Sequence, residues 1–537
     1  MRKDAVMDNI QSTYVSASTG IDFGEVSSDT NGKGVYMRAG TENDPYPIVY
    51  YRGAVEDNNV LFNNKCWKVV RTTDTGGVKL IYNGEKQVIT DYENNDTISD
   101  TDINYTNDGT YPYTYDSTTM KWTSGNAGIN NSTGTFIFTI KEAGDYTINY
   151  TVSSEASYDK AKFYKNKTQL KEDSGTESGS INLGSLTTSD EIKVEYTKDS
   201  ISASGNDNVL FEIIKNSGNQ TQRESCDNTG VDTHINISGT SMFAFNTNYN
   251  SPAYVGYMYG DVYTYNSGAA TSGAYFGSSF TYDGTNYTLV NPVTTKNNTH
   301  HYTCNLTTAD GTCATIRYYY YDNYYVNLTG GDSIERAMEK MQTNTNNSNA
   351  KDKIDTWYAS NMAGVTSKLE DTIWCNDRSV GNGNNNGWIA NGGDLNTNLY
   401  YGARERSNYA NNTSTVKNGP SLACTNKNDA FTVSNGNGNQ KLTYPVALLT
   451  EDEMVLAGGL AGSSSTFYLN NGSTYYWSLS PNRFYYSDAR EFVVNCGYIY
   501  SGYVDYTYGL HPSVSLKPGT PIVKGDGTAT SPYIIGS

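Results

Sequence analysis

The chain has 537 residues, enough for roughly two to four domains, and its 36% share of hydrophobic residues is low for a globular protein. Its 56 acidic and 38 basic residues give a net charge of −18, which disfavours nucleic acid and anionic membrane surfaces as partners. Residues 1–30 read as an N-terminal extension without the apolar run of a targeting segment, so either the protein is soluble or a native anchor lies outside this chain; we favour the second.

The first part of the main domain, residues 31–97, is predicted to be β-structure. Runs such as PIVYYRGAV and GGVKLIYNG are rich in β-branched and aromatic residues and are separated by Asn-Asn, Asp-Asn and Gly-Gly turns.

Residues 98–217 then change character. Short alternating runs such as DYTINYTV recur between turn signals, which predicts a separate all-β sandwich inserted into the main domain.

Helices are expected only in the second part of the main domain, residues 218–537. Apolar side chains recur at helical spacing in 331–342 and in 350–362. Thr450 and Glu453 have the spacing of a capping box, which predicts a further helix start. With long Asn- and Gly-rich loops around them, these segments predict an α+β main domain of antiparallel sheets and two or three helices.

The seven cysteines form no C-x-x-C pair, and the four histidines are not at zinc spacing, so we expect no metal site and no cofactor. Two states of the cysteines remain open: seven reduced, buried thiols, or three disulfides and one free thiol. A composition rich in Asn, Thr, Tyr and Gly and poor in Lys favours disulfides and an extracellular location.

A tyrosine-rich stretch, YIYSGYVDYTY, occupies residues 498–508. With Ser501-Gly502 as a two-residue turn, it predicts a hairpin with Ile499 and Val504 on the core face. Three tyrosines then lie side by side on the other face: Tyr498, Tyr500 and Tyr503. Such a face is typical of a binding surface, because tyrosine offers a large contact area at low entropic cost. The alternative is an outer sheet face without a ligand, stabilised by cross-strand aromatic pairs.

Residues 478–516 contain no Lys, Gln, Met or Trp, and their only Glu is Glu491. Randomising the adenines of asparagine codons yields Tyr, Asp, Ser, Gly, Cys, Arg and His, and these are the residues scattered through this tract. Glu491 cannot arise in this way, so it is expected to be a fixed position.

Several segments resemble one family: YYRGAVEDNNVLFNNKCWKVVRTT, LTYPVALLTEDEMVLAGG, YYWSLSP and VDYTYGLHPSVSLKPG. The chain resembles bacterial surface proteins with a C-type-lectin-like domain that a diversity-generating retroelement diversifies. The resemblance implies a variable tract between the W-S-L-S-P and T-Y-G-x-x-P elements, with these candidate variable, ligand-binding positions: Asn482, Arg483, Tyr485, Tyr486, Asp488, Arg490, Cys496, Tyr498, Tyr500, Tyr503, Asp505 and Tyr506. His511 departs from the pattern, because relatives have arginine there.

The function that the resemblance implies is ligand binding at the bacterial cell surface, as an adhesin or receptor without enzymatic activity. The partner would be a protein or glycan on another cell or phage. A structural subunit of a surface layer or filament is the alternative, since tyrosine-rich faces also make assembly contacts. An enzyme similar to formylglycine-generating enzymes is disfavoured, because Cys496 has no second cysteine near it and no catalytic triad pattern is visible.

The cysteines are predicted to form three pairs and to leave Cys496 free, as one outcome at a variable position. The predicted pairs are Cys66–Cys226, Cys304–Cys313 and Cys375–Cys424.

Overall fold

The structure is a computed structural model that carries no ligand. It describes residues 15–17, 21–27, 33–39, 47–200, 205–265, 271–272, 277–282, 285–293, 300–310, 313–320, 324–325, 328–329, 334–381, 398–407, 419–470, 475–485, 487–495 and 497–536.

The chain divides into two compact units. Residues 1–87 and 224–537 form the main unit, and residues 88–223 form the inserted unit. The inserted unit begins ten residues before and ends six residues after the sandwich predicted at 98–217. Each unit has a hydrophobic core of its own.

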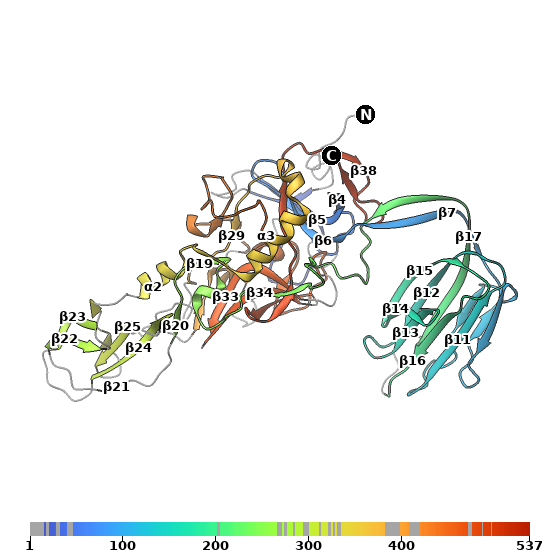
Figure 1. Ribbon diagram of the computed structural model, residues 1–537, viewed down its shortest axis with the longest axis horizontal. Helices are drawn as coiled ribbons and strands as arrows, with labels where there is room; N and C mark the ends of the chain where they lie inside the picture. The colour runs from blue at the N-terminus through green and yellow to red at the C-terminus, as the bar shows by residue number, and fades with distance from the viewer. Residues whose placement is uncertain are drawn as a thin grey trace. The chain divides into compact units, whose positions relative to one another are not determined.

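The inserted unit consists of two sheets with a shared core (Figure 1). One sheet contains β7 (Gln87–Thr97), β9 (Thr114–Asp116), β10 (Lys121–Thr123), β12 (Gly144–Ser153), β15 (Thr176–Leu186) and β17 (Asn208–Ser225). The other contains β8 (Ile103–Asn107), β11 (Thr133–Ile140), β13 (Lys160–Lys165), β14 (Thr168–Asp173) and β16 (Ile192–Thr197). A short 3-10 helix, η1 (Asp100–Asp102), precedes β8.

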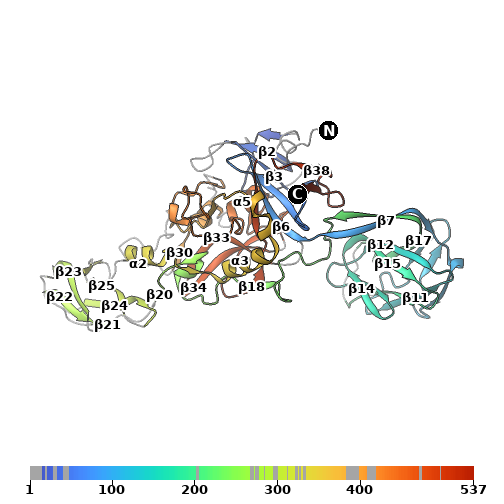
Figure 2. The ribbon, with the colours of Figure 1, turned by 45° about the horizontal axis from the view of Figure 1, so that its top comes forward.

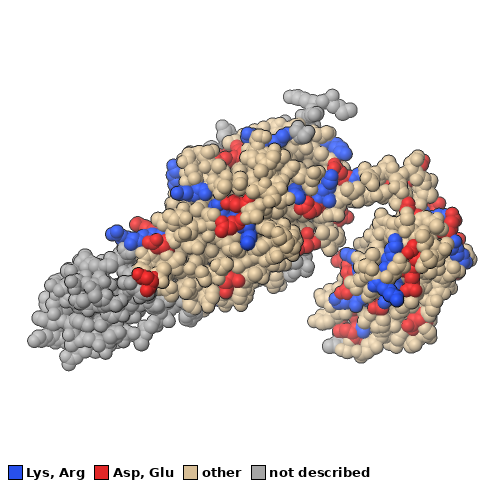
Figure 3. Space-filling model, in the orientation of Figure 1, with Lys and Arg blue, Asp and Glu red and all other residues tan. Residues whose placement is uncertain are grey.

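Strict alternation of side chains creates this sandwich. In β12, Tyr146, Ile148, Tyr150 and Val152 are buried while the residues between them are more exposed. On the outer faces, basic and acidic side chains alternate, as Figure 3 shows for the visible face, and many form ion pairs such as Lys193–Glu195. The outer faces of the sandwich therefore carry charges of both signs, with the acidic side chains in excess: residues 88–223 contain 20 Asp and Glu against 11 Lys and Arg.

The main unit contains a large mixed sheet of nine described strands. These are β1 (Val15–Ala17), β2 (Gly34–Arg38), β3 (Ile48–Arg52), β4 (Asn59–Phe62), β5 (Lys65–Thr72), β6 (Val78–Glu85), β37 (Ser513–Leu516), β38 (Ile522–Lys524) and β39 (Tyr533–Ile535). The C-terminal strand β39 pairs in parallel with β4, and β37 pairs with β6. Strands from the two ends of the described chain thus complete one sheet.

A second sheet of the main unit carries the tyrosine-rich tract. Its described strands are β18 (Met242–Ala244), β30 (Asn398–Tyr400), β32 (Leu460–Ala461), β33 (Tyr476–Tyr485), β34 (Asp488–Asn495), β35 (Tyr498–Tyr503) and β36 (Thr507–Gly509). Helix α3 (Asn349–Asn361) packs against β18 (Figure 2). The indole of Trp477 in β33 donates a hydrogen bond to the carbonyl oxygen of Phe243, which ties the central strand to β18.

The remaining elements of the main unit are short. The described helices besides α3 are η2 (Pro252–Val255), α2 (Ile334–Met341), η3 (Ala363–Lys368), α4 (Gly402–Ser407), η4 (Lys427–Asp429) and α5 (Glu451–Leu456). The small sheets contain β19 (Met258–Tyr259), β20 (Tyr263–Tyr265), β21 (Thr271–Ser272), β22 (Gly277–Tyr282), β23 (Thr285–Val293), β24 (His300–Thr308), β25 (Cys313–Tyr320), β26 (Tyr324–Tyr325), β27 (Leu328–Thr329), β28 (Asn346–Asn347), β29 (Trp374–Cys375) and β31 (Ala430–Phe431).

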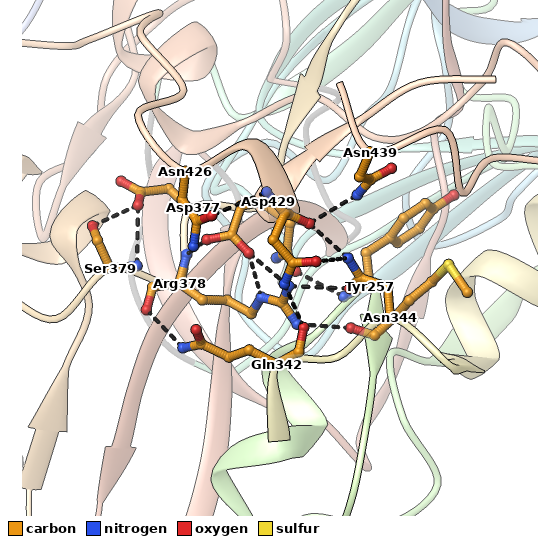
Figure 4. Close-up of polar contacts among 12 residues, drawn as sticks. Tyr257, Gln342, Asn344, Asp377, Arg378, Ser379, Asn426, Asp429 and Asn439 are labelled. Atoms are coloured by element: carbon orange, nitrogen blue, oxygen red, sulfur yellow. Dashed lines mark hydrogen bonds and ion pairs between the residues drawn. The ribbon is translucent and has the colours of Figure 1, made fainter. Parts of the chain in front are cut away.

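A buried polar network fixes the loops beside the second sheet (Figure 4). Arg378 donates its Nε to Asp429 at 2.7 Å and also binds the side-chain oxygen of Asn344 and the carbonyl oxygen of Met258. Asn376 donates to the carbonyl oxygen of Leu479 in β33 at 2.9 Å. A buried guanidinium with this many partners is a rigid connection, because each lost bond would leave an unsatisfied buried group.

The predicted α+β, C-type-lectin-like main domain is wrong. In the described part of the chain, strands account for 46% of residues and helices for 12%, and the molecule consists mainly of sandwich-like β-structure. Helices do occur at 334–341 and 349–361, and the capping box of Thr450 and Glu453 is confirmed. These helices are too short to form a layer, because the Asn-, Thr-, Tyr- and Gly-rich sequence between them favours strands and turns. The sheets are also mixed, not purely antiparallel.

Two of the three predicted disulfides are confirmed: Cys66–Cys226, whose sequence separation is 160 residues, and Cys375–Cys424. The side chains of Cys304 and Cys313, and all of Cys496, lie outside the described residues. Two disulfides indicate a chain that folds in an oxidising, extracytoplasmic compartment. Within the described residues, every helix is too short or too polar to cross a membrane.

Candidate ligand-binding surface

The tyrosine-rich tract forms a hairpin, but its turn lies elsewhere than predicted. β34 and β35 pair from Arg490↔Tyr503 to Asn495↔Tyr498, so the chain reverses between Asn495 and Tyr498, and Ser501-Gly502 lies within β35. Gly497 has a φ of 91°, in the left-handed region that favours glycine at a tight turn. Gly502 has a different role: a Cβ there would lie 2.7 Å from the ring of Tyr508 and 3.0 Å from Val493.

The corrected register divides the tyrosines between two faces. Ile499 and Val504 are buried, as predicted. Because side chains alternate along a strand, Tyr498 and Tyr500 share one face of β35 and Tyr503 points to the other. The prediction of three tyrosines side by side is therefore wrong. Tyr503 lies an odd number of residues from Tyr498 and Tyr500 in the same strand, so its side chain is on the opposite face.

One face carries an arginine–tyrosine row that crosses four strands. Directly paired residues run from Tyr400 in β30 to Arg483 in β33, Arg490 in β34 and Tyr503 in β35. The Arg490 guanidinium lies 3.9 Å from the Tyr503 ring centroid and donates to the Tyr503 hydroxyl at 2.6 Å. Tyr485 lies two residues after Arg483 in β33. Its ring centroid is 4.7 Å from the guanidinium carbon of Arg483 and 5.5 Å from that of Arg490.

Further tyrosines extend this row into a continuous ladder of rings. Ring centroids are 4.9 Å apart for Tyr503 and Tyr506, 6.4 Å for Tyr506 and Tyr508, and 5.1 Å for Tyr508 and Tyr475. Tyr506 is 52% exposed and Tyr475 is 36% exposed. Since Tyr508 packs on Gly502 on the opposite face, the ladder passes around the end of the sheet.

Sequence reasoning missed a third arginine. Arg404 in α4 donates to the side-chain oxygen of Asn482 at 3.1 Å and lies over Tyr400, 4.5 Å from its ring centroid. It stands 78 residues before Asn482, and no local motif marks it. Only the pairing of β30 with β33 brings it to the row.

The three-arginine cluster, Arg404, Arg483 and Arg490, is electrostatically unfavourable in the free protein. Burial, with the nearby Arg483 and Arg490, lowers the pKa of Arg404 to about 10. Burial and the charge of Arg490 also lower the pKa of Arg483. Among the described residues, none of the three guanidinium groups forms an ion pair with a carboxylate, and the Nε atoms of Arg483 and Arg490 have no hydrogen-bond partner.

The twelve candidate positions are mostly accessible. Of the ten that the structure describes, eight are exposed or half-buried: Arg483, Tyr485, Asp488, Tyr498, Tyr500, Tyr503, Asp505 and Tyr506. Asn482 and Arg490 are buried, and Tyr486 and Cys496 lie outside the described residues. The residues between them are mostly core, including Phe484, Ala489, Glu491, Phe492, Val493, Val494, Ile499 and Val504.

His511 occupies a buried structural position. Its Nδ1 lies 2.8 Å from the carbonyl oxygen of Tyr82, and its ring meets that of His234 edge-on at 4.8 Å between centroids. Burial and the neighbouring His234 lower the pKa of His511 to about 3, so the imidazole is neutral in the folded protein. A neutral ring here makes none of the ion pairs expected of an arginine.

The described residues contain no cluster of three or more His, Cys, Asp or Glu side chains that could hold a metal ion. The expectation that the chain needs no cofactor stays a prediction.

No family model and no curated protein matches the chain. Among solved structures, the secreted serine protease VesC from Vibrio cholerae is 10% identical, with a TM-score of 0.17 over 36% of this chain and 48% of that one. A family 29 carbohydrate-binding module is 10% identical, with a TM-score of 0.15 over 26% of this chain and 89% of the module. TmCBM61, solved with β-1,4-galactotriose, is 11% identical, with a TM-score of 0.13 over 23% of this chain and 90% of that one.

This chain therefore matches about half the length of the protease. At TM-scores this low, none of these likenesses informs the fold or the function of the chain.

Proposed function

We propose that the chain is a ligand-binding protein of the bacterial cell surface, an adhesin or receptor, whose binding surface is the tract from Asn482 to Tyr506. In this proposal the tract is diversified by a retroelement, the scaffold is the mostly β main unit, and the protein has no catalytic activity. The partner is a protein or glycan on another cell or phage.

The observation that carries the proposal is the separation of exposed and buried residues along β33, β34 and β35. Accessible Tyr, Arg and Asp residues interleave with a nearly continuous buried set. Accessible positions can change without loss of the core, since surface substitutions away from packing contacts usually alter stability by less than about 0.5 kcal/mol. A surface of this kind can vary while the fold stays constant.

The composition of this surface also supports binding. Tyr498, Tyr500 and Tyr506 are 39%, 56% and 52% exposed. Rings held in place by strands offer apolar area and a hydroxyl with little further loss of side-chain entropy on binding. Arginine beside them is the other residue type that dominates binding energy at protein surfaces.

Comparison of the gene among independent isolates tests the proposal. We expect substitutions to concentrate in the codons of the twelve positions, while codons 88–223 serve as the internal control. A neighbouring reverse-transcriptase gene and a template repeat that differs only at adenines should accompany them. An invariant tract without these neighbours would contradict diversification, and filaments formed by the purified protein would favour a structural subunit instead.

A further inference from the structure

We infer that the three-arginine cluster is a subsite for the carboxylate of an acidic sugar. This inference rests on the proposed binding role of the same surface and names the chemical class of its ligand. Two of the arginines, Arg483 and Arg490, belong to the candidate variable tract, and Arg404 belongs to the scaffold in α4.

The cluster has the features of a site prepared for an anion. Arg483 and Arg490 are directly opposite each other on neighbouring strands, an arrangement that costs stability because like charges repel. Arg490 is only 8% exposed, and yet its Nε has no hydrogen-bond partner among the residues that the structure describes. A carboxylate bound to the guanidinium groups would offset this repulsion, and arginine binds carboxylates through paired hydrogen bonds.

The rings around the cluster already hold the guanidinium groups in place. Tyr400 lies under Arg404, Tyr485 under Arg483, and Tyr503 under Arg490. Stacking of this kind fixes planar guanidinium groups at a modest energy. Little side-chain entropy is then lost when the anion binds, which favours affinity.

The net charge of −18 further restricts the chemical class of ligand that could bind. A polyanion would be repelled by the protein as a whole, whereas an isolated carboxylate feels mainly the nearby arginines, because screening removes charges beyond about 10 Å. The ladder of Tyr503, Tyr506 and Tyr508 begins at Arg490 and offers hydroxyl groups and ring edges. Hydroxyl-rich partners suit such a surface, so we favour an acidic sugar over an acidic peptide.

Calorimetric titration of the purified full chain with glucuronate at low ionic strength tests the inference. We expect weak binding, with a dissociation constant on the order of 1 mM, as is usual for a monosaccharide-sized ligand. Glucose should bind at least tenfold more weakly because it lacks the carboxylate. Arg404→Gln and Arg483→Gln should each weaken glucuronate binding at least tenfold.

Arg223→Gln is the matched control, since it removes the same charge from an ion-paired arginine of the inserted unit and should leave the binding unchanged. The inference is overturned if glucuronate does not bind, if Arg483→Gln binds it like the wild type, or if acetate or a short glutamate peptide binds equally well. The comparison of genes among isolates tests whether the tract is diversified, and the calorimetric titration tests whether the arginine cluster binds a carboxylate. Either proposal can therefore fail while the other stands.

Discussion

Two regions of the main unit differ in how their charged side chains are paired. Around α5, Glu453 accepts hydrogen bonds from Arg71 at 2.8 Å and Lys79 at 2.9 Å, and Arg406 pairs with Asp452 at 2.7 Å. In the arginine–tyrosine row, three arginines lie together and, among the described residues, none pairs with a carboxylate. Both regions combine strand and helix residues of the same unit, so the type of secondary structure does not explain the difference.

A buried carboxylate sharpens the contrast. Glu491 in β34 is completely buried, and within the described part of the chain neither of its oxygens has a hydrogen-bond partner. Glu453 is buried as deeply and is bound by two cations. Breaking a buried ion pair is costly because the remaining charge loses its partner, and a buried carboxyl group without a partner avoids the cost of an unpaired charge by staying protonated. The two regions therefore differ in their electrostatic cost, and we propose that ligand binding offsets the cost of the row.

The largest expected effect comes from removing the paired acid. Glu453→Gln removes the carboxylate that Arg71 and Lys79 share, so the free energy of unfolding of the main unit should fall by about 3–5 kcal/mol. Urea denaturation followed by hydrogen exchange of main-unit peptides measures this loss, and peptides from residues 88–223 are the control. A loss below about 1 kcal/mol would show that the ion pairs of Glu453 contribute little to stability, and would contradict the contrast between the two regions.

The same pair predicts a loss of stability in acid. The cations Lys79 and Arg71, together with the hydrogen bond from Thr450, outweigh burial and hold the pKa of Glu453 at about 2, below its usual value of about 4.5. Its contribution is therefore present above pH 4.5 and disappears as pH falls toward 2, about 3 kcal/mol in all. Denaturation curves of wild type and Glu453→Gln should converge over this interval, and parallel curves would contradict the assignment.

Glu491 should behave in the opposite way. Burial raises its pKa well above 4.5, so its protonated form suits the folded protein, and stability is lost as pH rises above 4.5. Glu491→Gln removes this loss and should stabilise the main unit by about 1–3 kcal/mol at pH 7 and by much less at pH 4. Thermal unfolding at both pH values measures the gain. Destabilisation at pH 7 would show that the carboxylate has a partner.

The sequence predicted some of these features for physical reasons that can be stated. The burial of Ile499 and Val504 was predicted correctly, because aliphatic side chains within a strand-forming tract are usually buried; the shared face predicted for them depended on the wrong turn, since Val504 is five residues from Ile499 and follows the end of β35. The turn was misplaced because the sequence contains two glycines, and only the structure shows that Gly497 turns the chain while Gly502 makes room for Tyr508. That error moved Tyr503 to the wrong face.

Other features had no local signal at all. Arg404 reaches the row through the pairing of β30 with β33, a contact between distant segments that periodicity does not reveal. The α+β prediction is wrong because the helices at 334–341 and 349–361, although correctly located, are few and short beside the many strands around them. Local patterns identified elements, but the balance among elements is decided by long-range pairing.

The smallest expected effect is the most direct comparison of the two regions. Arg483→Gln removes one of two like charges that face each other across β33 and β34, so the main unit should become more stable by about 0.2–1 kcal/mol. A structural role for Arg483 predicts the opposite sign. Thermal unfolding at low and high salt separates the two, because repulsion, and therefore the gain, should shrink as salt screens it. If Arg483→Gln both stabilises the main unit and weakens glucuronate binding, then Arg483 is a residue that lowers stability and contributes to ligand binding.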